Sequence, residues 1–512
     1  MLVVHNMQPS NLIGLAGIVA VIAGCFALSA NRSRIDWRTV IWGLLLQVAF
    51  AVLIIRGETI ARLFDLVLPL QHSLLLTIVL VQVLALYLIA RFSKPIAAKT
   101  SMVWVRRLVF AEVVVYALKF NLVGALFTAL KNGAEQVLRY SSTGAAFVFG
   151  VFGSEEGMRS AFSTALGDKT ASVAFVFAFQ VLPTIIFVAS IFSVLYYLGV
   201  MQPIIQAIAG FMSRFMRASG AETLDVAANI FMGQTEAPLT IKPYLANLTR
   251  SELFTLMVSG MCHCSAGILV VYVSVAGVDM RHLMASVIMT APGAIMLSKM
   301  VIPETGMPET SRAKSLEAPD RASLPNDSNG PVNVIDAAAR GASEGLILAA
   351  NVAAMLIAFI ALIALVNGIW SSLRDVAIQH TTGSLQQIVT AVPLTIQQLL
   401  GYAFAPIAFI TGVPWGEAVQ VGNLLGTRIV LNEFVGYIEL GKIKALLSPK
   451  SFMISTYLLC GFGSLTSIAI MAGGVGALVP SRRAELAALG LKAVLIGVMS
   501  NILAASIAGV LF

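Results

Sequence analysis

The feature that most constrains this fold is a series of apolar runs, each long enough to cross a lipid bilayer. A helix needs about 20 apolar residues to span ~30 Å of hydrocarbon. Runs of this kind recur along the chain, near residues 11–30, 38–55, 72–91, 102–118, 171–200, 252–277, 283–302, 345–367, 389–411, 452–474 and 486–511. Hydrophobic residues make up 58% of the sequence and charged residues only 11%. We therefore expect an all-α polytopic membrane protein, because helices satisfy their own backbone hydrogen bonds in lipid.

Basic residues indicate how the chain is oriented. Arg32, Arg34 and Arg38 closely follow the first apolar run, and cytoplasmic loops are enriched in lysine and arginine. We therefore expect the N-terminus outside and the first loop inside, with the first run kept as a span rather than cleaved as a signal peptide. The net charge of +8 is typical of basic cytoplasmic loops, and we expect no nucleic-acid partner.

Two apolar regions are interrupted by short polar segments that each carry one carboxylate. The first is Gly233-Gln234-Thr235-Glu236-Ala237-Pro238-Leu239, and the second is Leu431-Asn432-Glu433-Phe434-Val435-Gly436-Tyr437. A charged residue at membrane depth costs roughly 2.5–3.5 kcal/mol on insertion scales, so the two glutamates are candidate functional residues. A polar loop at the membrane surface is the alternative interpretation of the first segment.

Similar sequence follows both segments, which indicates an internal repeat. Each is followed by a basic residue, Arg250 or Lys450, and then by an apolar helix that contains a glycine, Gly260 or Gly461. Interrupted helices in corresponding positions of two halves are typical of inverted-repeat transporters, with the substrate bound where the repeats meet. Chance similarity between short apolar and basic stretches is the alternative.

These features divide the chain into a scaffold and a two-part core. A short segment near 58–70 has its charges on one face and is expected to lie in the membrane interface. In chain order we expect N-terminal membrane helices at 1–120, interfacial helices at 121–168, a first core half at 169–302 with a re-entrant hairpin at 222–247, a polar loop at 303–340, and a second core half at 341–512 with a hairpin at 413–446.

The cysteines give no sign of a disulfide framework or a metal centre. All of them lie within apolar runs, at Cys25, Cys262, Cys264 and Cys460. Cys262-His263-Cys264 contains metal-ligating residue types, but consecutive side chains on a helix point about 100° apart and cannot converge on one ion. We expect the cysteines to be small buried side chains.

From about residue 140 to the C-terminus, the chain resembles the concentrative nucleoside transporters, which include bacterial nucleoside permeases. The resemblance rests on the two polar segments, on Gly461-Phe462, and on the stretches 332–338 and 412–418, in the family's order and spacing. It implies two re-entrant hairpins and partly unwound helices. It also implies a homotrimeric secondary transporter of a bacterial cytoplasmic (inner) membrane, not an enzyme, without a cofactor other than the coupling ion.

The resemblance also implies the substrate-binding residues. Family members contact the nucleobase with the first hairpin, the ribose hydroxyls with the second, and the substrate again with an unwound helix of pattern Phe-x-Asn-x-x-Ser. On this chain the positions are Gln234, Thr235, Glu236, Glu433, Phe462, Ser464 and Ser467. The chemistry is suitable, because an amide can pair with a base edge and a carboxylate can accept from a ribose diol. Ser464 stands where the family has Asn, and its hydroxyl has a shorter reach.

The coupling-ion site implied by the resemblance has one unusual residue. It comprises Asn229, the carbonyl of Met232, a position at which the family has a serine or threonine hydroxyl, and the residue after that position. On this chain the last two positions are His263 and Cys264. Sodium prefers oxygen ligands, whereas imidazole suits protons and softer metals. A shift of one residue would place Cys264 or Ser265 at the hydroxyl position, so sodium and proton coupling are both compatible with the sequence.

Cation-driven nucleoside uptake is therefore the leading hypothesis. One alternative is a nucleoside sensor that has kept the fold without transporting. Another is a membrane-embedded enzyme with Glu236 and Glu433 as a carboxylate pair, but no nucleophile–base arrangement is visible in the sequence.

Overall fold

The computed structural model describes residues 9–67, 81, 114–166, 176–310, 331–391, 393 and 395–512, and every regular element within them is helical. This confirms the expected all-α fold. Its principal helices are α1 (Pro9–Ala27), α2 (Trp37–Ile55), α3 (Gly57–Val67), α6 (Leu122–Phe149), α7 (Glu155–Leu166), α9 (Phe177–Gln180), α10 (Leu182–Tyr197), α11 (Met201–Met216), α12 (Gly220–Asn229), the 3₁₀ helix η4 (Ala237–Asn247), α13 (Arg250–Cys262), α14 (Ala266–Ala276), α15 (Met280–Val301), α16 (Val334–His380), α17 (Ser384–Ala391), α18 (Ile396–Ile410), α19 (Trp415–Val430), α20 (Glu433–Lys442), α21 (Pro449–Leu459), α22 (Leu465–Leu478) and α23 (Arg483–Leu511).

Short 3₁₀ turns connect some of these helices. They are η1 (Arg32–Arg34), η2 (Gly150–Gly153), η5 (Lys444–Leu446) and η6 (Pro480–Arg482). Helices α1 and α2 match the first two expected spans, and α3 covers most of the segment expected at the interface. The expected spans near 72–91 and 102–118 lie outside the described residues, apart from residue 81 and residues 114–118.

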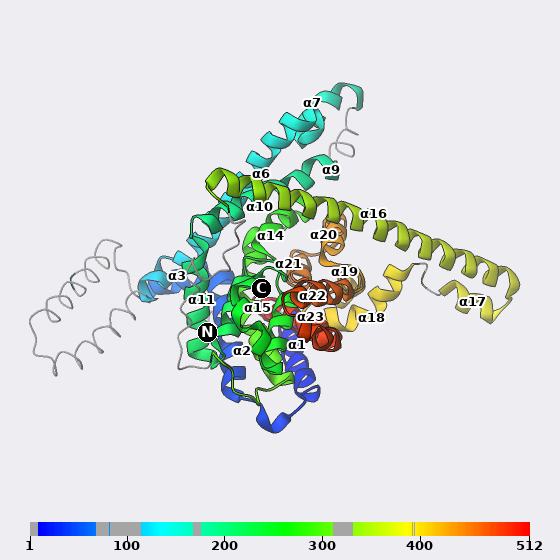
Figure 1. The fold of residues 1–512 in the computed structure, drawn as a ribbon. Coiled ribbons are helices and arrows are strands. Elements are labelled where there is room, and N and C mark those ends of the chain that lie inside the picture. The colour runs from blue at the N-terminus through cyan, green and yellow to red at the C-terminus, as the bar shows by residue number, and fades with distance from the viewer. Residues whose placement is uncertain are drawn as a thin grey trace, which may run out of the picture.

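The two core halves have the same order of elements. Each has a long helix (α10 or α16), a hairpin (α12 with η4, or α19 with α20), a helix broken in the middle (α13–α14 or α21–α22) and a final long helix (α15 or α23). Figure 1 shows α15, α21, α22 and α23 gathered in the centre of the molecule. The order of elements matches the repeat that the two polar segments predict.

The hairpins enter the core from opposite ends of α15, as an inverted repeat requires. Glu222, at the base of the first hairpin, pairs with Lys299 in the last turn of α15 at 2.8 Å. Lys444, at the base of the second hairpin, donates to the Gly277 carbonyl just before the N-terminal end of α15, at 2.9 Å. Since α15 has 22 residues and a helix rises 1.5 Å per residue, the two bases are roughly 33 Å apart.

Local capping explains where the hairpin helices begin. Ser219 with Glu222 forms a capping box at the start of α12, and Thr249 with Glu252 forms another at the start of α13. At the tip of the second hairpin, the Asn432 side chain accepts from the Val435 N–H at 3.0 Å and starts α20. A cap of this kind satisfies backbone donors that have no partner within the helix, so the chain can reverse at membrane depth.

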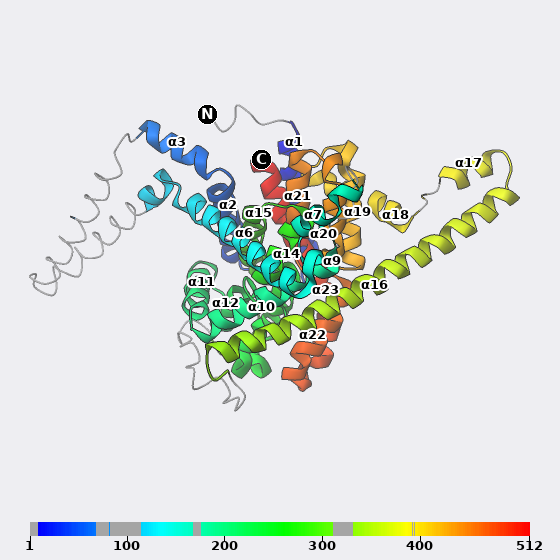
Figure 2. The ribbon, with the colours of Figure 1, turned by 90° about the horizontal axis from the view of Figure 1, so that it is seen from above.

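The boundaries of some expected segments differ from those of the observed helices. The span near 345–367 is only the centre of α16, which has 47 residues and begins at Val334, before the expected end of the 303–340 loop. Figure 2 shows α16 extending beyond the body of the protein toward α17. Residues 121–168 contain one helix of 28 residues, α6, followed by α7. Hydropathy marks the apolar part of a helix, whereas backbone hydrogen bonding continues into its polar ends.

The apolar run near 389–411 is not one span. It is divided between α17 and α18, because Thr395 caps the start of α18 by accepting from the Gln398 N–H at 3.2 Å. Helices α18 and α19 then meet at a bend of 116°. The expected single span was wrong here, since a hydropathy window does not detect a polar cap within an apolar stretch.

Candidate substrate and ion site

The tip of the first hairpin packs closely on both core halves. A Cβ added at Gly260 of α13 would lie 3.0 Å from the Gln234 Cβ, and one added at Gly474 of α22 would lie 2.5 Å from the Thr235 Cγ2. The two glycines therefore allow the tip to approach these helices. Gln234 is 7% exposed, and within the described residues its side-chain oxygen has no hydrogen-bond partner. This oxygen can accept a hydrogen bond from a ligand.

Glu236 is placed differently from its two neighbours. Its side chain is exposed, whereas Gln234 is buried and Thr235 is half-buried. One carboxylate oxygen of Glu236 accepts from the Gly233 N–H at 3.3 Å, which closes the tip into a tight turn. The first hairpin therefore presents a buried amide and an exposed carboxylate.

The tip of the second hairpin holds Glu433 inside the protein. Glu433 is 7% exposed, and its carboxylate accepts from the Tyr272 hydroxyl of α14 at 2.9 Å. The Tyr272 ring stacks on Tyr437, with centroids 4.1 Å apart. Sequence reasoning missed Tyr272, although a tyrosine in a buried apolar helix usually has a polar partner. The hydrogen bond leaves other lone pairs of the carboxylate available.

The break between α21 and α22 carries the remaining predicted substrate residues. The Ser464 hydroxyl lies 2.8 Å from the Thr466 hydroxyl and 3.0 Å from that of Ser467, and Ser467 donates to the Phe462 carbonyl. Thr466 also donates to the Leu431 carbonyl at 3.4 Å, next to Glu433. The break and the second hairpin tip therefore form one connected polar surface, on which Phe462 is half-buried.

The two helix breaks contact each other directly. The Phe462 N–H donates to the His263 carbonyl at 3.2 Å. Residue His263 has extended backbone geometry, and helix α13 ends at Cys262. The helical arrangement assumed for Cys262-His263-Cys264 was therefore wrong, because these residues form the break itself.

A buried arginine that sequence reasoning missed connects the two breaks through Asn501. Arg428 of α19 is 0% exposed. It donates to the carbonyls of Leu458 and Gly461, and at 2.7 Å to the Asn501 side chain of α23. Asn501 in turn donates to the carbonyls of Cys262 and Cys460, at 3.0 and 2.6 Å. Broken helices leave carbonyls without helical partners, and Arg428 and Asn501 satisfy four of them.

Two of the predicted ion-site residues meet through a serine. The Asn229 amide donates to the Ser259 hydroxyl at 3.0 Å, and His263 Nδ1 lies 2.8 Å from the Ser259 carbonyl oxygen. Asn229 and Ser259 are therefore in contact, with His263 beyond them. The Met232 N–H donates to the Ala228 carbonyl at 2.8 Å, which continues the last turn of α12 toward the tip. Cys264 follows His263 in the break after α13 and is fully buried.

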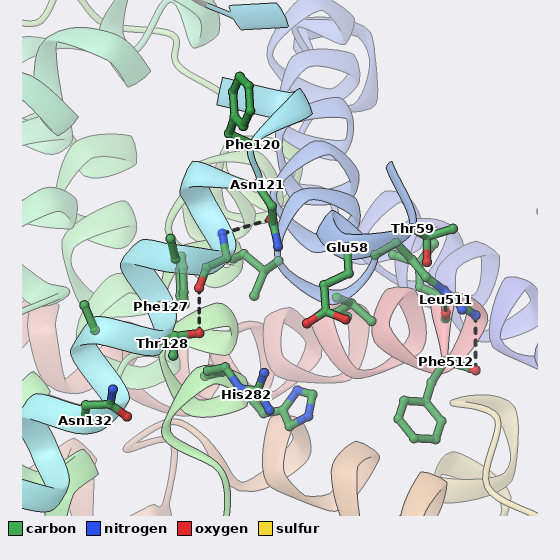
Figure 3. Close-up of a pocket in the computed structure, with 17 residues that line it drawn as sticks. Glu58, Thr59, Phe120, Asn121, Phe127, Thr128, Asn132, His282, Leu511 and Phe512 are labelled. Atoms are coloured by element: carbon green, nitrogen blue, oxygen red, sulfur yellow. Dashed lines mark hydrogen bonds between the residues drawn. The ribbon is translucent and has the colours of Figure 1, made fainter. Parts of the chain in front are cut away.

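A cavity among the described residues lies elsewhere. It has a volume of about 870 Å³ and is lined by residues of α2, α3, α6 and the start of α15, together with Leu511 and Phe512. Figure 3 shows Glu58, Asn121, His282 and Phe512 around it. None of the predicted site residues lines this cavity. These residues lie instead at the hairpin tips and the helix breaks.

Comparison with known proteins identifies the family. Residues 282–509 match the family model described as Na+ dependent nucleoside transporter C-terminus, and residues 16–75 match the corresponding N-terminus model. Residues 178–279 match a model described as nucleoside recognition. A nucleoside permease of Helicobacter pylori is 37% identical over 390 residues, covering 75% of this chain and 85% of that protein. The chain belongs to the concentrative nucleoside transporter family.

Other members of the concentrative nucleoside transporter family match almost the whole chain. Sodium/nucleoside cotransporter 2 of Rattus norvegicus is 33% identical, covering 99% of this chain and 63% of that protein. The structure of CNTnw in an inward-facing substrate-bound state covers 98% of this chain and 100% of that chain, with a TM-score of 0.74 and 33% identity. The family consists of membrane transporters rather than enzymes, and it uses sodium as its coupling ion.

Proposed function

We propose that this concentrative nucleoside transporter takes up nucleosides by symport, with the substrate held between the two hairpin tips and the two helix breaks. The supporting observation is the convergence of these four irregular segments. Thr235 of the first tip packs on α22, Leu431 of the second tip accepts a hydrogen bond from the start of α22, and the breaks are joined by Phe462 and His263. Irregular backbone at membrane depth is tolerated where it is buried in protein or lines a polar cavity.

The side chains on these segments suit the parts of a nucleoside. The unpartnered oxygen of Gln234 and its amide nitrogen can pair with the donors and acceptors of a nucleobase edge, with Thr235 and Glu236 beside it on the same tip. The Glu433 carboxylate can accept from two vicinal ribose hydroxyls while it keeps its hydrogen bond from Tyr272. Phe462 can cover a ring face, and Ser464 and Ser467 offer hydroxyls to the sugar.

We infer that sodium is the coupling ion of this chain. Asn229, the Met232 carbonyl and the Ser259 hydroxyl supply oxygen atoms at the end of the first hairpin, and hard cations prefer oxygen ligands. The His263 ring contacts the Ser259 carbonyl. His263 therefore positions Ser259 and is not itself a ligand of the ion. Cys264 is assigned no role at the ion.

The family and the helix pattern also support a proposal for the oligomeric state, the membrane and the division of the chain. We propose a homotrimer in a bacterial cytoplasmic (inner) membrane, with a transport core at 169–302 and 341–512. Residues 1–120 would act as a scaffold, with interfacial helices at 121–168 and a connection at 303–340. Large side chains along α16 are exposed in the single chain, including Ile357, Ile360, Leu365, Ile369, Leu373 and Val376. An exposed apolar row of this kind is suitable for contact with lipid or with neighbouring protomers.

Uptake into proteoliposomes tests this proposal. Radiolabelled uridine and adenosine are offered under an inward sodium gradient, an inward proton gradient, or neither, at constant membrane potential. Concentrative uptake with sodium alone supports the proposal, and uptake driven only by protons would reassign the coupling ion. A protein that binds nucleosides but shows no counterflow would instead be a sensor.

Sugar selectivity gives a second prediction. The Ser464 hydroxyl is already within hydrogen-bonding distance of Thr466 and Ser467, and it is shorter than the family's asparagine. The unaltered transporter should therefore discriminate weakly between ribonucleosides and deoxyribonucleosides. Ser464→Asn should increase the preference for ribonucleosides by about tenfold, the equivalent of one net hydrogen bond. Competition uptake with uridine and deoxyuridine measures this preference, and an unchanged ratio would contradict the assignment of Ser464 to the sugar.

A further inference from the structure

An additional buried carboxylate lies beside the proposed sodium site. Asp225 precedes Asn229 by one helical turn on α12 and is 0% exposed. Its Oδ2 accepts from the Asn229 amide at 3.1 Å, whereas its Oδ1 has no hydrogen-bond partner within the described residues. None of the ion pairs formed by those residues includes Asp225.

In its ionised form, such a carboxylate needs a positive partner. Removing a charge from water costs several kcal/mol unless an opposite charge and hydrogen bonds compensate it. The other buried acidic residue of α12 illustrates the usual solution, since Glu222 pairs with Lys299 at 2.8 Å. At Asp225, the carboxylate receives one hydrogen bond from the described part of the chain, and its donor is a neutral amide.

The atoms around this amide are all oxygens. The Asn229 Nδ2 lies 3.1 Å from Asp225 Oδ2, 3.3 Å from the Asp225 carbonyl and 3.0 Å from the Ser259 hydroxyl. The N–H₂ end of this amide, which carries a partial positive charge, therefore donates only to oxygen atoms among these contacts. Rotation of the Asn229 amide by 180° would present its own oxygen to the same group. Oxygen ligands with one carboxylate are a suitable environment for a hard cation.

We propose that Asp225 supplies the negative charge of the sodium site, with Asn229 and Ser259 as neutral oxygen ligands. The inference rests on the proposed sodium coupling and adds a charged ligand that the family resemblance does not assign. Because Asp225 and Asn229 lie on α12 and Ser259 lies on α13, a bound ion joins the first hairpin to the broken helix. Sodium binding would thereby fix the position of the Gln234 tip before the nucleoside arrives.

Sodium binding to the purified full-length protein tests Asp225 directly. The amount of ²²Na+ bound and the melting temperature are both measured against sodium concentration at constant ionic strength with choline. Asp225→Asn and Asp225→Ser should raise the half-saturating sodium concentration at least about tenfold, which corresponds to about 1.4 kcal/mol. Asp375→Asn is the matched control, since it removes the same charge from an exposed position on α16, and it should leave sodium binding unchanged.

Nucleoside-induced stabilisation at saturating sodium separates this inference from the proposed function. If both Asp225 variants keep that stabilisation and also the wild-type half-saturating sodium concentration, Asp225 is not a sodium ligand, whereas nucleoside transport stands. Wild-type protein that binds no sodium but takes up nucleosides with protons also overturns the role of Asp225. Loss of nucleoside binding and uptake in the wild type would reject the proposed function, independently of the sodium measurement.

Discussion

The Glu433→Gln variant is expected to bind nucleosides roughly 10–150-fold more weakly than the unaltered transporter, which is the cost of one charge-assisted hydrogen bond, about 1.5–3 kcal/mol. Glutamine keeps the shape of the side chain and can still accept from the Tyr272 hydroxyl, which lies 2.9 Å away. It loses the negative charge that a ribose diol would contact. The apparent affinity is measured from concentration-dependent uptake and from nucleoside-induced thermal stabilisation.

Glu439→Gln is the matched control for this variant. Glu439 lies on the same helix, α20, but its carboxylate pairs with Lys442 at 2.7 Å on the surface, where ion pairs contribute little. The control should leave nucleoside affinity unchanged. If folded Glu433→Gln protein has the same affinity as the wild type, Glu433 serves the fold of the hairpin rather than the substrate, and the ribose contact must be sought among the hydroxyls near Ser464.

The membrane fold and the two hairpins could be predicted because they leave strong signals in the sequence. Apolar runs mark the helices, and the pairs Glu236/Glu433 and Arg250/Lys450 mark the repeat. The resemblance implied partly unwound helices, but the position of the break at His263 was not predicted, since Cys262, His263 and Cys264 lie in a largely apolar run and include no glycine or proline. Donors supplied from distant segments, the Asn501 amide and the Phe462 N–H, satisfy the carbonyls of that break. A local sequence pattern does not contain this information.

The residues that the sequence did not reveal are buried polar groups whose partners lie far away in the chain. Tyr272 contacts Glu433, and Arg428 contacts Asn501. Asp225 was not singled out from the sequence. Their roles are inferred from their burial and from whether each has a hydrogen-bond partner. Only the packing of the two core halves determines these properties.

Arg428 provides the test of how the two breaks are held together. Its three donors reach the carbonyls of Leu458 and Gly461 and the side chain of Asn501. Lysine has the same charge but lacks the planar fork of donors. Arg428→Lys should therefore lose at least one of these charge-assisted hydrogen bonds, at a cost of about 1.5–3 kcal/mol. Arg428→Gln loses the charge as well, and its effect should be larger.

We expect both Arg428 variants to melt at lower temperatures than the wild type and to bind nucleosides more weakly, since Phe462 and Ser464 belong to one of the breaks. Arg374→Lys is the matched control. Arg374 also donates to two backbone carbonyls, those of Val389 and Thr390, but it does so on α16, away from the breaks. If Arg428→Lys melts and binds nucleosides like Arg374→Lys, the breaks keep their geometry without the guanidinium. Asn501 and the contact between Phe462 and His263 would then be sufficient to hold them.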